Sequence, residues 1–137
     1  MVRKAEHKDV NAILSLARDF ATSFVIEEKA FHTSFIAILA DSSAHVAVAE
    51  AEEDIIGYVL AVSHNTFYAN GRVAWVEEIM VHANHRKQGV GKGLMQSVEN
   101  WAAGQGCKLI ALATRRAANF YEAINYQASA TYYRKFF

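Results

Sequence analysis

Residues 75–94 read WVEEIMVHANHRKQGVGKGL, and this stretch decides the fold of the chain. The run from Val73 to Val81 is rich in β-branched and apolar residues and predicts a strand. Gly89 and Gly91 then open an amphipathic pattern that predicts a helix. At such a helix N-terminus free backbone N–H groups converge, and the helix dipole favours negative charge. The stretch therefore predicts a binding site for an anion.

Three basic residues, Arg86, Lys87 and Lys92, flank the glycine turn and suit a pyrophosphate. Two familiar phosphate-binding patterns do not fit the spacing. A Walker loop needs a glycine where Arg86 stands and a serine or threonine where Gly93 stands. A dinucleotide-binding fingerprint needs a third glycine, at the position of Leu94, and an acidic residue at the end of the next strand, which the chain lacks. The anion is therefore expected to belong to a different phosphorylated cofactor.

The chain as a whole has the length and composition of one globular domain, residues 1–137. Its 14 basic and 14 acidic side chains cancel, so no bulk electrostatic attraction to nucleic acid or to a membrane is expected. The single cysteine, Cys107, excludes an internal disulfide framework and fits a reducing compartment. The N-terminal residues lack an apolar signal core, and no apolar run reaches membrane-spanning length. We expect a cytoplasmic protein.

Hydrophobic periodicity divides the chain into short strands and amphipathic helices. Strands are predicted at residues 2–5, 45–51, 55–64, 73–81, 109–113 and 129–136, and helices at residues 8–21, 29–39, 116–124 and from the glycine turn to Gly104. Asn70-Gly71 predicts a hairpin turn, and Asn125 predicts a left-handed end to the last helix. A meander of strands followed by β-α-β crossovers implies an α/β fold, with helices on the faces of a mixed sheet.

Three motifs in this order carry a family resemblance. They are R/Q-x-x-G-x-G, met by Arg86, Gly89 and Gly91, the preceding strand VEEIMV, and the later segment NFYEAINY. Together they resemble the GNAT superfamily of acyl-coenzyme A N-acyltransferases, over nearly the whole chain. The resemblance implies the GNAT fold, a central mixed and mostly antiparallel sheet with helices on both faces. It also implies transfer of an acetyl group from acetyl-CoA to a primary amine, by direct attack in a ternary complex.

The resemblance also implies where the cofactor lies. The backbone of the central strand is expected to pair with the pantetheine arm and to polarise the thioester carbonyl. The backbone N–H groups of the glycine turn are expected to hold the pyrophosphate. The residues expected at the cofactor are Ile79, Met80, Val81, Arg86, Lys87, Gln88, Gly89, Val90, Gly91 and Lys92.

Acetyl transfer to an amine requires a base for the amine, donors for the oxyanion and an acid for the leaving thiolate. Glu77 and Glu78 are the candidate bases, and since adjacent strand residues point to opposite faces, at most one should face the reaction. The resemblance favours Glu77, although a bulge in the strand would exchange the two roles. The resemblance assigns the acid to Tyr121, in the segment NFYEAINY.

The acceptor is expected to be the amine of a small molecule, since the C-terminal region resembles small members that acetylate amino-phosphonates, aminoglycosides or other small amines. Some aromatic residues are candidates for an acceptor pocket or for the core: Phe24, Phe31, Phe67, Tyr68 and Trp75. Glu27 and Glu28, between the first two helices, either attract a cation or form a solvated turn.

Other functions stay open at this point. One is acetylation of a protein N-terminus or lysine, and another is a non-catalytic sensor that binds acyl-CoA. The aromatic residues at the C-terminus, Tyr132, Tyr133, Phe136 and Phe137, suggest a homodimer that buries them. No metal site is expected, because His82 and His85 lack a third ligand at suitable spacing.

Overall fold

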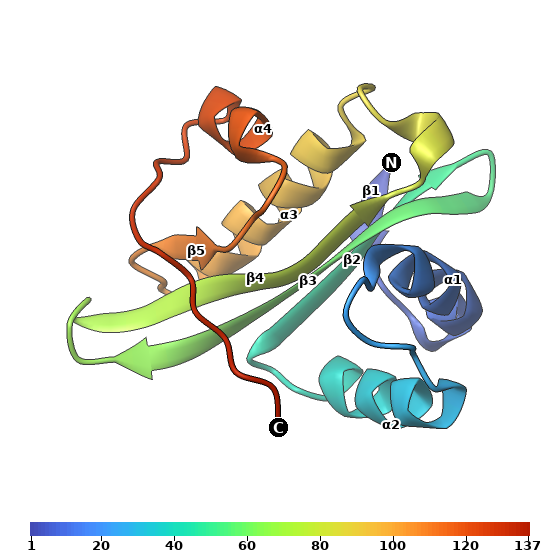
Figure 1. Ribbon diagram of the computed structural model, residues 1–137, viewed down its shortest axis with the longest axis horizontal. Helices are drawn as coiled ribbons and strands as arrows, with labels where there is room; N and C mark the ends of the chain where they lie inside the picture. The colour runs from blue at the N-terminus through green and yellow to red at the C-terminus, as the bar shows by residue number, and fades with distance from the viewer.

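The computed structural model describes the whole chain, residues 1–137, around a five-stranded sheet in the order β1-β2-β3-β4-β5 (Figure 1). The strands are β1 (Val2–Lys4), β2 (Ala44–Ala51), β3 (Asp54–Thr66), β4 (Gly71–Val81) and β5 (Ile110–Leu112). The α-helices are α1 (Val10–Phe20), α2 (Glu28–Leu39), α3 (Val90–Gly104) and α4 (Ala118–Ala123). All strand pairs are antiparallel except β4 and β5, which are parallel. The predicted mixed sheet is confirmed.

Helices cover both faces of the sheet, and each face has its own core (Figure 1). Tyr58 and Val46 pack with α1 and α2 on one face. Val59 packs with Leu94 and Val98 of α3 on the other. The change of face between Tyr58 and Val59 follows from the two-residue period of a strand. The predicted apolar stripe of α3 is thus the side that contacts the sheet.

Local turn signals in the sequence have the backbone geometry that they predict. Asn70 and Gly71 both have positive φ, 60° and 149°, at the turn between β3 and β4. Asn125, two residues after the end of α4, has a φ of 74°. Between β2 and β3 the turn residues Glu52 and Glu53 also have positive φ, 51° and 70°. Residues other than glycine rarely have a positive φ. The two-residue turn requires it here, and this tight turn fixes the register of the hairpin formed by β2 and β3.

A bulge interrupts β4 at Glu77. Leu60 of β3 pairs with Glu78, whereas Ala61 pairs with Val76, so Glu77 is the extra residue on β4. The insertion resets the alternation of faces, because Val76 and Ile79 both pack into the core that contains α3.

The strand β4 also loses its second neighbour at this point. Parallel pairing with β5 covers only the three residues from Ala74 to Val76. Beyond Val76, the backbone groups of β4 that point away from β3 therefore have no strand partner. The residues concerned are those expected at the cofactor, Ile79 to Val81.

The prediction of a strand at residues 129–136 is wrong. The last backbone hydrogen bond in the chain joins Tyr126 N–H to Tyr121 C=O, and no ladder forms beyond it. The tail instead crosses the sheet, with the Tyr132 ring 6.4 Å from Trp75 on β4 (Figure 1). A strand needs a neighbouring edge, and the three-residue β5 offers a short one. The aromatic side chains find partners on the face of the sheet.

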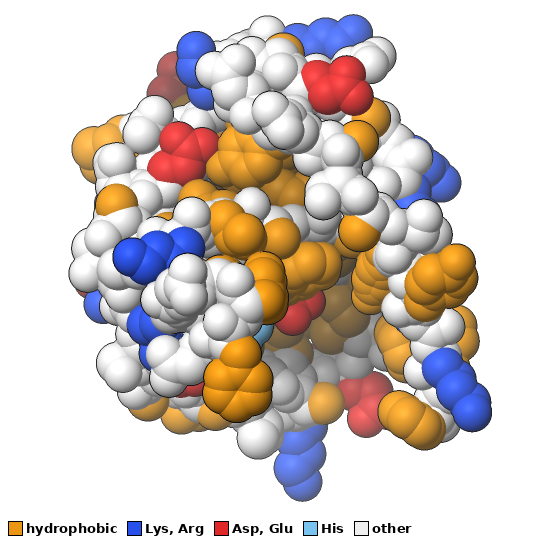
Figure 2. Space-filling view, turned by 90° about the vertical axis from the view of Figure 1, so that its left-hand side faces the viewer, with side chains coloured by type: hydrophobic (Ala, Val, Ile, Leu, Met, Phe, Trp, Pro, Cys, Tyr) orange, Lys and Arg blue, Asp and Glu red, His pale blue; other side chains and the backbone are white.

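Hydrophobic side chains are exposed in several places on the side of the molecule that carries the β3–β4 hairpin (Figure 2). Phe67 and Tyr68 at the hairpin tip are exposed, and so are Tyr132 and Tyr133 in the tail. None of the helices combines the length and the hydropathy needed to span a membrane.

An ion cluster joins the N-terminal segment to the sheet. The Arg3 guanidinium donates to both carboxylate oxygens of Asp9, at 2.8 and 2.9 Å, and also to Glu50. Asp9 is buried and accepts a further hydrogen bond from the Glu6 N–H at 2.8 Å. The hydrogen bonds from Arg3 lower the pKa of Asp9, and the Glu6 N–H adds to this effect.

Candidate active site

A pocket of about 470 Å³ lies between the end of β4, the glycine turn and α4, and we call it the glycine-turn pocket. The predicted cofactor residues that line it are Ile79, Met80, Val81, Arg86, Lys87, Gly89, Gly91 and Lys92. Gln88 and Val90 belong to the same turn without lining the pocket. The structure therefore brings the end of the strand and the basic turn together, as the motif order predicted.

The backbone of the turn is shaped for close approach to a ligand. Lys87 and Gly89 have positive φ, 62° and 83°, and α3 begins at the next residue, Val90. The first helical bond runs from Gly93 N–H to Gly89 C=O, at 3.0 Å. The N–H groups of the first turn before Gly93 have no partner within the helix. Together with the helix dipole, they make the turn suitable for an anion.

Two further contacts fix the walls of this pocket. A Cβ at Gly91 would lie 3.2 Å from the ring of Phe120, so glycine allows α4 to approach α3 here. The Arg86 Nε donates to the Val81 C=O at 3.1 Å, which holds the arginine against the end of β4. The positive charge of Arg86 therefore lies beside the end of β4.

Tyr121 projects from α4 into the wall of the glycine-turn pocket. Its side chain is buried, and edge-on aromatic contacts with Phe120 and Tyr126 hold the ring at centroid distances of 4.9 and 5.9 Å. Tyr126 in turn donates its hydroxyl to Glu99 at 2.8 Å. Burial raises the pKa of Tyr121, so its hydroxyl is protonated at neutral pH and available as a proton donor.

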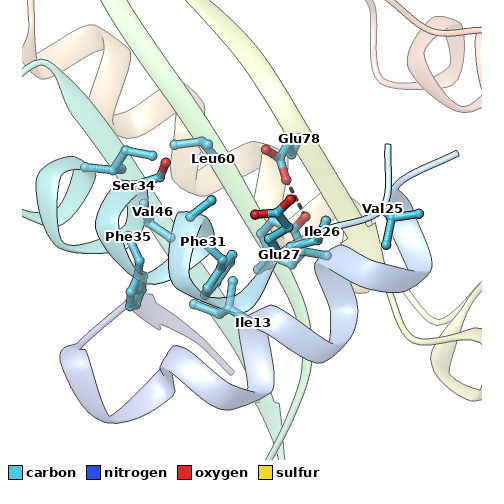
Figure 3. A pocket seen from close by; sticks show the side chains of 14 residues that line it. Ile13, Val25, Ile26, Glu27, Phe31, Ser34, Phe35, Val46, Leu60 and Glu78 are labelled. Carbon is cyan, nitrogen blue, oxygen red and sulfur yellow. Dashed lines mark hydrogen bonds between the residues drawn. The ribbon is translucent and has the colours of Figure 1, made fainter. Parts of the chain in front are cut away.

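A second pocket, of about 480 Å³, lies on the opposite face of the sheet, where α1, α2 and their connecting loop meet β2, β3 and β4 (Figure 3). We call it the apolar pocket, since 11 of its 14 lining residues are hydrophobic. Two carboxylates line it, Glu78 from β4 and Glu27 from the residue before α2 (Figure 3). No lysine, arginine or histidine is among the lining residues.

Glu78 is held by a hydrogen bond from the Tyr58 hydroxyl to its Oε1, at 2.6 Å (Figure 3). Burial raises the pKa of Tyr58 strongly, and the charge of Glu78 raises it further. Tyr58 therefore stays protonated and acts as a donor. No local signal in the sequence identifies Tyr58, because its contact with Glu78 depends on which residues of β3 and β4 lie across from one another.

The two candidate bases occupy different environments. Glu78 lines the apolar pocket and is half-buried, whereas Glu77 is exposed at the bulge and lines neither pocket. Of the aromatic residues considered for the acceptor, Phe31 lines the apolar pocket. Phe24 and Trp75 contact the tail instead, through Phe136 and Tyr132. Phe67 and Tyr68 are exposed at the hairpin tip, and Glu28 is exposed outside the pocket.

The sequence of residues 10–126 matches the acetyltransferase (GNAT) family. The chain belongs to this family. A search by sequence finds no related protein among curated ones. The GNAT resemblance seen in the motifs is thereby confirmed over most of the chain.

Several solved structures share the fold of this chain. Glucosamine-6-phosphate N-acetyltransferase from Arabidopsis thaliana is 21% identical with a TM-score of 0.86, over 100% of this chain and 97% of that one. The aminoglycoside N-acetyltransferase AAC(6')-Iy in complex with CoA is 20% identical with a TM-score of 0.86, over 98% and 93%. A transcriptional regulator from Bacillus halodurans C-125 is 24% identical with a TM-score of 0.90, over 100% and 99%. At these identities the likeness establishes the fold alone.

Proposed function

We propose that this GNAT protein transfers an acetyl group from acetyl-CoA to the primary amine of a small molecule, by direct attack in a ternary complex. The observation that carries the proposal is the course of β4 between the two pockets. Glu78 lines the apolar pocket, and the next residue, Ile79, lines the glycine-turn pocket. An acceptor in one pocket and a thioester in the other would meet at this point of the strand.

The glycine-turn pocket has the donors that coenzyme A requires. Arg86, Lys87 and Lys92 bring three positive charges to a helix N-terminus, which suits a pyrophosphate. Between Ile79 and Val81, the backbone groups on the side away from β3 have no strand partner and, apart from the Val81 C=O that accepts from Arg86, are free to pair with pantetheine amides. Acetyl-CoA, when bound, supplies the acetyl group on a thioester. A GNAT neighbour was solved with CoA, which supports this choice of cofactor.

Within this proposal, the residues of the chain divide the proton transfers between them. An alkylammonium has a pKa of about 10.4, so its proton must be removed near neutral pH, directly or through water. Glu78 accepts that proton, and the amine nitrogen bonds to the acetyl carbon. A backbone N–H of β4 near Ile79 donates to the oxyanion that develops. As the carbon–sulfur bond breaks, Tyr121 donates its hydroxyl proton to the departing thiolate. The nitrogen loses its second proton in the same collapse, and that proton, passed through solvent, restores the Tyr121 hydroxyl.

The choice of Glu78 over Glu77 rests on the bulge. The family resemblance favours Glu77, and the inserted residue at that position places Glu78 beside the apolar pocket instead. We expect Glu78→Gln to lower kcat by about 10²- to 10⁴-fold, the range for loss of a general base. Glu77→Gln is the matched control, with the same charge change one residue away. A larger loss of kcat in Glu77→Gln would return the role to Glu77.

Binding of the cofactor is the first experiment. Calorimetric titration of the folded protein with acetyl-CoA should give saturable binding, with ATP and NAD as negative controls. Release of thiol in the presence of a panel of amines then tests transfer. Absence of acetyl-CoA binding would contradict the proposal at its base. Binding without thiol release across the panel would favour the alternative of a non-catalytic acyl-CoA sensor.

Tyr121→Phe tests the acid separately from binding. The substitution removes the hydroxyl and keeps the ring contacts with Phe120 and Tyr126. We expect kcat to fall while the Kd of acetyl-CoA stays unchanged, because the proton is needed only as the thiolate leaves. A loss of affinity equal to the loss of kcat would assign Tyr121 to binding alone.

A homodimer remains part of the proposal. The hairpin tip and the tail both carry exposed aromatic side chains. Association of two copies would remove this apolar surface from water. Sedimentation at micromolar concentration tests it, and a monomeric mass would contradict it.

A further inference from the structure

The composition of the apolar pocket indicates which class of amine it would accept. Its side chains combine a large apolar wall with two carboxylates, Glu27 and Glu78, and no cation. Neither carboxylate takes part in a salt bridge within the protein. The only hydrogen bond from a side chain to this pair is the one from Tyr58 to Glu78. Both carboxylates therefore keep acceptor positions for a positively charged ligand.

Part of the apolar wall is left uncovered by the chain itself. Val25 lines the pocket and is 94% exposed, an unusual state for a branched apolar side chain beside other apolar residues. Phe31 is half-buried and stacks on Phe35 at a centroid distance of 5.7 Å. Leu60 completes the wall from β3, next to Glu78 across the strand pair. A ligand with an apolar body would cover this surface.

We propose that the acceptor is a monoamine on an apolar body, either an arylalkylamine or an alkylamine. The ammonium group lies between Glu78 and Glu27, and the body lies against Val25, Phe31 and Leu60. The volume of about 480 Å³ is in the range of small-ligand sites. The inference rests on the proposed function, since it names the substrate that the transferase would accept.

The same wall disfavours the acceptors of the structural neighbours. A sugar phosphate would bring a dianion beside two carboxylates, with no lysine or arginine in the pocket to offset the repulsion. A polyhydroxylated aminosugar would bury hydroxyl groups against Val25, Phe31 and Leu60, which offer no hydrogen-bond partner. The polar side-chain groups available are Ser34, Glu27, Glu78 and the Tyr58 hydroxyl, which already donates to Glu78.

The test measures kcat/KM by thiol release at saturating acetyl-CoA, for a series of amines on the full chain. Phenethylamine and linear amines from propylamine to hexylamine are compared with glucosamine 6-phosphate, an aminoglycoside and spermidine. We expect kcat/KM to rise about 3- to 4-fold for each added methylene, which corresponds to burial of one CH₂. The apolar monoamines should exceed the aminosugars by tenfold or more. Equal or better use of an aminosugar or of spermidine would overturn the proposal.

Two pairs of variants test the contribution of the apolar wall of the pocket separately from that of its carboxylates. Phe31→Ala should lower kcat/KM for phenethylamine at least tenfold, whereas Phe67→Ala, at the exposed hairpin tip, should leave it unchanged. Glu27→Gln should raise the KM of the amine with kcat unchanged, because Glu27 contacts the ligand away from the thioester. Glu28→Gln is its control, since Glu28 lies outside the pocket. Equal effects within either pair would contradict the placement of the ligand.

Calorimetry of the amines with the protein saturated with coenzyme A gives a readout that does not depend on turnover. Binding of phenethylamine without acetylation would contradict the proposed function and support the assignment of the pocket. Acetylation of aminosugars with weak binding of apolar amines would do the opposite. Failure of the inference and failure of the function are thereby distinguishable.

Discussion

Substitution of Gly57 by alanine tests whether the close packing around β4 is as tight as the structure shows. A Cβ at this position on β3 would lie 3.0 Å from the backbone oxygen of Met80, 3.3 Å from Cδ1 of Leu94 and 3.5 Å from Cγ1 of Val90. The first contact is with backbone, and Leu94 is fully buried, so neither neighbour moves freely. Overpacking of this kind costs about 1–3 kcal/mol. Alanine also lowers the conformational entropy of the unfolded chain, which stabilises the folded state by about 0.4–1 kcal/mol.

Because the closest contact is with backbone, we take the upper half of the overpacking range, about 2–3 kcal/mol. The net destabilisation is then about 1–2.6 kcal/mol, which corresponds to a fall in Tm of about 3–9 °C for a domain of this size. Thermal unfolding followed by circular dichroism measures it. The matched control is Gly104→Ala in α3, where an added Cβ meets no atom within 4 Å and alanine is the better helix former. We expect that variant to be as stable as the wild type or more so.

The same substitution should also weaken the cofactor site. Displacement of the Met80 carbonyl moves the backbone that is proposed to pair with pantetheine, so the Kd of acetyl-CoA should rise in Gly57→Ala and not in Gly104→Ala. An unchanged Tm in Gly57→Ala would refute the tight approach of β3, β4 and α3. A lower Tm with an unchanged Kd would refute the role of the Met80 backbone in binding.

Three further predictions concern the turn, the ion cluster and the thiol. Gly89→Ala should cost about 1–2 kcal/mol of stability because φ is 83°, with no steric clash to add, and it should raise the Kd of acetyl-CoA in calorimetry. Because Arg3 lowers the pKa of Asp9, its contribution is present above the unfolded pKa of about 3.9 and is lost as the pH falls further. Urea unfolding between pH 7 and pH 2 should therefore show a steeper acid loss in the wild type than in Asp9→Asn. Burial raises the pKa of Cys107, so iodoacetamide should label it more slowly at pH 7.5 than it labels a free thiol, as mass spectrometry can follow.

The elements that the sequence predicted correctly are those with local causes. The left-handed conformation of Asn70, Gly71 and Asn125 depends on what each residue tolerates, and all three have positive φ. The stripe of α3, with Leu94 and Val98 facing the sheet, follows from helical periodicity. The glycine turn combines both kinds of signal. Such features can be predicted without knowledge of the neighbouring strands.

The C-terminal tail shows why a strand propensity alone is insufficient. Aromatic residues favour strands because they pack well on a pleated surface, and the tail is rich in them. The same side chains can also lie across the face of a sheet, as Tyr132 does beside Trp75. Phe136 likewise contacts Phe24 at 5.6 Å, in the loop between α1 and α2. Which arrangement forms depends on the length of β5, a property of another segment.

The facing of Glu77 and Glu78 at the candidate site also depends on another segment, and so it could not be predicted from the sequence of β4 alone. Strict alternation predicts opposite faces for Glu77 and Glu78, and it holds only for a strand without insertions. The bulge is a property of the pairing with β3, where Leu60 meets Glu78 and Ala61 meets Val76. The sequence of β4 shows no sign of it. The contribution of Tyr58 was hidden for the same reason, since its hydroxyl reaches Glu78 across the strand pair.

The bulge and the end of the parallel pairing fall on consecutive residues of β4, and this coincidence explains how one strand can serve two ligands. Up to Val76 the strand has neighbours on both sides. From Glu77 onward it keeps β3 alone, and its other edge opens toward the glycine turn. An insertion that resets the faces at this point turns Glu78 to the apolar pocket while Ile79 lines the other. Removal of Glu77 would make Val76 and Glu78 neighbours, and these two residues already pair with the adjacent residues Ala61 and Leu60. The later residues of β4 should then keep their faces in a regular strand, with Glu78 still beside the apolar pocket. We therefore expect the deletion variant to retain thiol release if Glu78 is the base, and abolition of transfer in a folded deletion variant would contradict that role.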